Sequence, residues 1–141
     1  MIELVEGARS IVETCVRVKP GEKVLVIVDD EAFPMEIGRV MMDVANSAGA
    51  EAVLAVMKPR KIAGHEPPHA IAIAMRAVDA VIYITNRHGI VHTNARKEAT
   101  AAGVRMYQMI EVPEGYFMLK ITSGDLEQIK DRTEKLALKQ V

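Results

Sequence analysis

Residues 23–57 read KVLVIVDDEAFPMEIGRVMMDVANSAGAEAVLAVM, and this stretch decides the fold class. Residues 23–28 and 51–57 are apolar runs rich in β-branched side chains, which is typical of strands covered on both faces. Between them, Pro34 stands near the start of a segment with helical apolar spacing that ends at Gly49. The stretch therefore predicts a strand–helix–strand crossover, the unit from which parallel sheets are built.

The alternation continues on both sides of this unit. Apolar periodicity and Pro or Gly punctuation predict helices at residues 3–17, 71–78, 94–102 and 126–136, and strands at residues 79–85 and 104–110. We therefore predict one α/β domain over residues 1–141, a three-layer αβα arrangement with a mainly parallel, Rossmann-like sheet of four strands or slightly more.

Composition limits the classes of partner and of compartment. Half of the 141 residues are hydrophobic and 26% are charged, the balance of a globular domain. The 18 basic residues nearly cancel the 19 acidic ones, so no overall field gathers nucleic acid or anionic membrane, and neither partner is predicted. Charged residues interrupt the first twenty positions, which argues against a signal peptide or membrane span. Cys15 is the only cysteine, fits a reducing compartment and is expected to be a small buried residue, so we predict a cytoplasmic protein.

The densest polar cluster is the loop that follows the predicted strand 79–85. Residues 85–96 read TNRHGIVHTNAR, with two imidazoles and two guanidiniums. In open α/β sheets ligands bind beyond the carboxyl ends of the strands, so this loop is a candidate ligand site. We predict that Asn86 and His88 contact a substrate there.

The second half of this loop runs into the start of the helix predicted at 94–102. Thr93 or Asn94 can cap that helix, and its unpaired N–H groups would suit an anionic ligand group. Arg96 can clamp a carboxylate, and His92 can exchange a proton near neutral pH. We therefore predict His92 as the catalytic residue and Thr93, Asn94 and Arg96 as substrate-binding residues. The alternative is a solvated loop followed by a capped helix.

Two further patterns suggest metal sites. Residues 65–69 read HEPPH, the letters of a zinc-peptidase motif, but Pro67 and Pro68 fit only a first helical turn, so His65 would lie outside the helix and we reject the motif. The acidic run at residues 29–31 could hold Mg²⁺ at a strand end, although neighbouring strand residues point to opposite sides and acidic residues also favour a helix start. We predict no metal-ligating residue in this chain. No Gly-rich phosphate motif follows any predicted strand, so nucleotide binding is unsupported.

Several segments together resemble one enzyme superfamily. They are residues 92–105 (HTNARKEATAAGVR), 18–24 (VKPGEKV), 48–50 (AGA) and 132–136 (RTEKL), and Pro67–Pro68 with Ala74–Met75. In order and spacing they resemble the superfamily of aminopeptidase T and the 2,5-dihydroxypyridine 5,6-dioxygenases, over nearly the whole chain.

The resemblance implies the N-terminal half of a longer two-domain enzyme. In that superfamily the metal ligands lie in a C-terminal domain, while the N-terminal domain walls the substrate cleft and supports assembly. It therefore implies a small-molecule or peptide substrate, a C-terminal catalytic domain and a homo-oligomer. It also implies Fe²⁺ for ring opening or Zn²⁺/Co²⁺ for peptide hydrolysis, with no cofactor in this chain and no activity of this chain alone. The alternative is a stand-alone, non-enzymatic module that binds a small ligand or forms oligomers.

Overall fold

The structure, a computed structural model, describes residues 2–62, 64–85, 90 and 92–110. Its elements, in chain order, are α1 (Ile2–Ser10), η1 (Ile11–Cys15), β1 (Lys23–Asp29), α2 (Ala32–Ser47), β2 (Glu51–Met57), α3 (His69–Arg76), β3 (Ala80–Thr85), α4 (Asn94–Ala101) and β4 (Arg105–Ile110). The helix predicted at residues 126–136 lies outside the described residues.

The predicted first helix changes its winding half-way. It is α-helical in α1 and then widens into the π-helical segment η1, where the Val16 amide donates to the carbonyl of Ile11, five residues earlier, at 2.9 Å. Arg17 then takes a positive φ of 57°, which ends the helix. Cys15, expected to be buried, is partly exposed and packs at the margin of the core.

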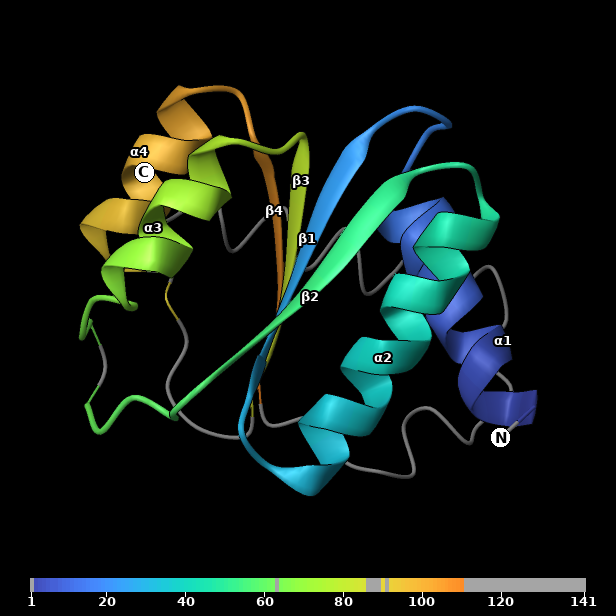
Figure 1. Cartoon of the computed structure of the whole chain (residues 1–141), viewed down its shortest axis with the longest axis horizontal. Coiled ribbons are helices and arrows are strands. Elements are labelled where there is room, and N and C mark those ends of the chain that lie inside the picture. Colours follow the sequence, from blue (N-terminus) through green and yellow to red (C-terminus); the bar gives the residue numbers. More distant parts are fainter. Residues whose placement is uncertain (1, 63, 86–89, 91, 111–141) are drawn as a thin grey trace.

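The four described strands form one parallel sheet in the order β2-β1-β3-β4. Helices α1 and α2 cover one face and α3 and α4 cover the other (Figure 1). The predicted three-layer αβα architecture with a four-stranded parallel sheet is thus confirmed. No helix in the described part of the chain has the length and apolar character needed to cross a membrane.

Strand alternation divides the core between the two faces. Val24, Val26 and Val28 of β1 pack with α1 and α2, whereas Leu25 and Ile27 pack on the opposite side. Asp29, the last residue of β1, continues the second series and therefore points to the α3/α4 side. The side chain of Asp29 is fully buried. Carboxylates are rarely buried unless other groups pair with them.

Candidate functional site

The carboxyl ends of β1 and β3 lie next to each other. Their register pairs Val28 with Ile84, so Asp29 and Thr85 follow directly on neighbouring strands. Tyr83, two residues before Thr85, points to the same face of the sheet as Thr85. All three side chains are buried with no exposed surface. The sheet thus brings a carboxylate and two hydroxyls together just before the polar loop begins.

The hydroxyls of Tyr83 and Thr85 both donate to Asp29. The Tyr83 hydroxyl lies 3.0 Å from Oδ1, and the Thr85 hydroxyl bonds Oδ2. Each carboxylate oxygen of Asp29 therefore has a partner inside the protein, as a buried carboxylate requires. We call these three residues the Asp29 cluster.

Burial raises the pKa of Asp29 above its ordinary value of 3.8, because desolvation penalises the charged carboxylate. The hydrogen bonds from Thr85 and Tyr83 act against this rise, the negative charge of Glu31 adds to it, and the positive charge of Arg60 opposes it. The pKa of Tyr83 is also raised, mainly by burial and then by the negative charge of Asp29. Tyr83 therefore stays a neutral hydrogen-bond donor.

The raised pKa of Asp29 predicts a pH-dependent difference between the wild type and Asp29→Asn. The carboxyl group of Asp29 binds its proton more tightly in the folded chain than in the unfolded chain. Protonation of Asp29 therefore stabilises the fold, and this stabilisation is complete below the unfolded pKa, near 3.8. It is lost as the pH rises through the folded pKa. The free energy of unfolding in urea should be measured from the unfolded pKa to above the folded pKa of Asp29. Over this range Asp29→Asn should gain stability relative to the wild type as the pH increases, because the amide does not ionise. A difference that is constant with pH would contradict the raised pKa.

Thr93 organises the start of α4. Its hydroxyl accepts from the Arg96 amide at 3.2 Å and donates to the Ile90 carbonyl at 2.6 Å, and Thr93 is completely buried. The Ile90 amide in turn donates to Oε1 of Gln108 on β4 at 2.9 Å. Thr93 is therefore the predicted N-cap, and since its single hydroxyl proton is already donated, it could meet a ligand only as an acceptor.

The carboxylate of Glu66 lies at the start of α4, where the sequence predicts an anionic ligand group. Its carboxylate accepts from the amides of Asn94 at 2.8 Å and Ala95 at 3.0 Å, while the amides of Arg96 and Lys97 bond the hydroxyl and carbonyl of Thr93. The first four N–H groups of α4 are therefore all satisfied within the chain. The prediction that these N–H groups are unpaired and available to an anionic ligand is wrong. The carboxylate of Glu66, 28 residues before Asn94, already lies at the positive end of the helix dipole.

The loop that carries Glu66 is fixed by Arg60. The guanidinium donates to the Glu66 carbonyl at 3.1 Å and to the Lys58 carbonyl at 3.2 Å. The helix α3 begins only at His69, so His65 lies outside it, as the rejection of the zinc-peptidase reading requires. Glu66 is instead a capping group that reaches α4.

Three other predicted site residues, His92, Asn94 and Arg96, lie in or next to the first turn of α4. His92 and Asn94 are exposed and Arg96 is half-buried with an interaction of its own, whereas Asn86 and His88 lie outside the described residues. In the acidic run, Asp29 is buried, Asp30 is exposed and Glu31 is half-buried, so the three do not present carboxylates to one point. Across the parts of the chain that the structure covers, no group of three or more His, Cys, Asp or Glu side chains is placed to hold a metal ion.

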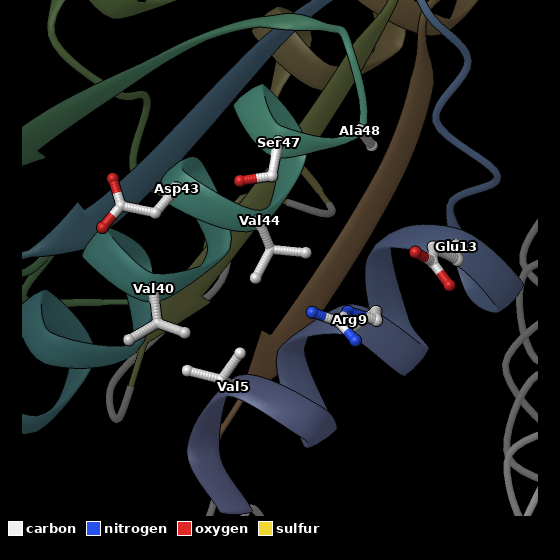
Figure 2. A pocket seen from close by; sticks show the side chains of 8 residues that line it. All are labelled: Val5, Arg9, Glu13, Val40, Asp43, Val44, Ser47 and Ala48. Atoms are coloured by element: carbon white, nitrogen blue, oxygen red, sulfur yellow. The ribbon is translucent and has the colours of Figure 1, made fainter. Parts of the chain in front are cut away.

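A groove of about 460 Å³ lies on the opposite face of the sheet, between α1 and α2. Figure 2 shows Arg9 and Glu13 on one side of it and Asp43 and Ser47 on the other, above apolar walls that include Val44. The groove combines one cation with two carboxylates on helix flanks, and no strand end points into it. We therefore place the candidate site at the carboxyl edge of the sheet.

Neither the Asp29 cluster nor the Glu66 cap was predicted from the sequence. The signal for the first was the polar residue at the end of an otherwise apolar strand, combined with Tyr83 and Thr85 at alternate positions of β3. For Glu66 the sequence held no comparable signal, because its partners are backbone amides far along the chain.

Solved structures share this fold. The structure of 2,5-dihydroxypyridine dioxygenase from Pseudomonas putida KT2440 matches with a TM-score of 0.62 at 16% identity, over 79% of this chain and 35% of that chain. Wild-type aminopeptidase T (AmpT) from Thermus thermophilus matches with a TM-score of 0.50 at 14% identity, over 93% of this chain and 41% of that chain. The chain thus spans less than half the length of either protein. No protein-family model and no curated protein matches its sequence.

Proposed function

We propose that this chain forms the substrate-cleft and assembly domain of a metal-dependent enzyme related to the 2,5-dihydroxypyridine dioxygenases or to aminopeptidase T. The similarity of fold to one protein of each kind supports this relationship, and it agrees with the sequence motifs at residues 92–105. The observation that carries the proposal is the gathering of polar side chains at the carboxyl edge of the sheet, beside the start of α4. Parallel α/β sheets bind their ligands at this edge.

In this proposal Arg96 and His92 divide the work on the substrate. The guanidinium of Arg96 orients an anionic or phenolate oxygen, and the imidazole of His92 moves a proton to or from the bound molecule. Asn94, exposed at the first position of α4, contributes its side-chain amide, and Asn86 and His88 complete the loop's contribution.

The bonds of Glu66 shape how a ligand would be held. Because the first amides of α4 already bond Glu66 and Thr93, an anionic oxygen would be bound by side chains, chiefly Arg96, and not by the helix backbone. The Asp29 cluster has a different role, since all of its atoms are buried. It fixes Thr85, and with it the strand end from which the loop with Asn86 and His88 departs.

The metal of such an enzyme does not fit the described residues. The two oxygens of Asp29 are bonded to Tyr83 and Thr85, and Glu66 is bonded to α4, so neither carboxylate is available as a ligand. The metal would therefore be bound by another part of the protein. The described residues contribute binding and proton transfer.

Binding of 2,5-dihydroxypyridine tests this proposal directly. Calorimetric titration of the chain should show binding, and the double substitution His92→Ala with Arg96→Ala should weaken it by about tenfold to a hundredfold, the cost of one charge-assisted hydrogen bond or two. The double variant should still fold, because His92 is exposed and neither substitution removes the Thr93 cap.

Matched substitutions at His69 and Lys97, also exposed and also changed to Ala, should leave binding unchanged. The isolated chain given ferrous iron and 2,5-dihydroxypyridine, or a divalent metal and amino acid amides, should show no turnover. Strong turnover by the isolated chain would overturn the proposed division between two domains. Loss of folding in the double variant would make His92 and Arg96 structural residues.

A further inference from the structure

The outer edge of β2 is open along the described part of the chain. β2 stands at one end of the strand order, and Figure 1 shows no described strand beside its outer side. The Glu51 amide donates to the Glu22 carbonyl and the Met57 carbonyl accepts from the Asp30 amide, so the odd-numbered residues of β2 direct their backbone groups toward β1. Because successive residues alternate, the backbone groups of Ala52, Leu54 and Val56 point outward.

This edge lacks the features that normally keep strands apart. Residues 52–57 contain no charged residue and no proline, and β2 pairs with β1 without a bulge over its whole length. Val53 is 51% exposed on one face of the sheet and Val56 is 45% exposed on the other. The backbone amide of Ala52 is not available to pair with another strand, because it donates to the side-chain oxygen of Asn46 at 2.8 Å. The open stretch therefore begins at Leu54.

We propose that β2 pairs with β2 of a second copy of this chain, antiparallel about a two-fold axis at Leu54, so that the two sheets become one continuous sheet. A two-fold axis perpendicular to the sheet places each residue opposite one that faces the same side, which Leu54 opposite Leu54 satisfies. Leu54 of each copy then exchanges both backbone hydrogen bonds with its equivalent, and the Val56 amide donates to the Ala52 carbonyl of the other copy.

The sequence of β2 favours a second copy over an unrelated strand because it complements itself in this register. Val53 lies opposite Ala55 and Val56 lies opposite Ala52, so each exposed valine meets a small apolar residue. Glu51 lies opposite Met57 of the other copy, so no two like charges face each other in this pairing. The bond from Ala52 to Asn46 disfavours a shift of the axis toward Ala52, since that amide is already used.

Sedimentation equilibrium of the chain at micromolar to millimolar concentration tests this pairing. The wild type should have the mass of two chains, and Val53→Lys combined with Val56→Lys should raise the dissociation constant at least about tenfold, since charges on an edge oppose pairing. Ile73→Lys is the control, because Ile73 is 48% exposed on α3, away from the edge, and this variant should remain a dimer.

A second variant and a local probe keep the test decisive if the lysine variant does not fold. Val56→Pro removes one outward amide without touching a bond to β1, and it should also weaken the dimer. Hydrogen exchange at the Leu54 amide should slow as the wild-type concentration rises. A monomeric wild type, a dimer that survives both variants, or a Leu54 amide equally protected at every dilution would overturn the proposal, the last because another segment would then cover the edge.

Discussion

Replacing Asp29 with alanine is expected to lower the free energy of unfolding by about 2–5 kcal/mol, because it removes the carboxylate to which two buried hydroxyls donate. The hydroxyl protons of Tyr83 and Thr85 are both directed to this carboxylate, and neither side chain reaches solvent. The two lost hydrogen bonds to Asp29, together with a small cavity, account for the decrease in stability. Urea unfolding at neutral pH measures it.

Two further variants separate the hydrogen bonds from the charge. Asp29→Asn keeps the volume and an acceptor for one hydroxyl, so it should cost clearly less than Asp29→Ala. Tyr83→Phe removes one donor and should cost about 1 kcal/mol. An Asp29→Ala variant as stable as the wild type would show that the Asp29 cluster does not hold the ends of β1 and β3 together.

Replacing Gly38 with valine is expected to destabilise the fold by about 3 kcal/mol or more, because helix α2 lies too close to the sheet for a side chain there. A Cβ atom at this position would lie 2.3 Å from Cγ1 of Val28 and 3.0 Å from Cδ1 of Leu54. Val28 is fully buried in β1, so it has no free space to move into. The helix would have to lift from β1 and β2, which would open the core on that face of the sheet.

The control for this prediction is the same new side chain on the outer face of the same helix. Glu36→Val introduces valine at an exposed position of α2, where it changes only helix propensity, by less than about 0.7 kcal/mol. Thermal unfolding of both variants gives the comparison. Similar losses at Gly38 and Glu36 would mean that the close contact between α2 and the sheet does not exist.

The elements of the sheet could be predicted from the sequence because each is decided locally. The strand predicted at residues 51–57 has the same bounds as β2, and each of the other three differs by one position at one end. Short apolar runs rich in β-branched side chains are typical of covered strands, and strand–helix–strand crossovers favour a parallel sheet. The change of winding at Ile11 could not be predicted, since the apolar spacing of residues 3–17 fits an α-helix equally well.

The candidate site could be located from the sequence but not assembled. Alternation predicts that Asp29 and Tyr83 each occupy one face of a strand, but only the order β1 beside β3 makes them partners. The Glu66 cap depends on how a proline-rich loop folds back over the sheet edge, and nothing local specifies that path. The twelve residues 85–96 therefore indicate where the candidate site lies, while long-range contacts decide which polar groups remain for a ligand.

Mapping the amide shifts of this chain during titration with 2,5-dihydroxypyridine tests the central claim most directly. Binding at the carboxyl edge of the sheet should shift the amides of Thr85, Ile90, Asn94 and Arg96. Shifts confined to the groove between α1 and α2, at Arg9 and Asp43, or no shift at any concentration of the ligand, would contradict it.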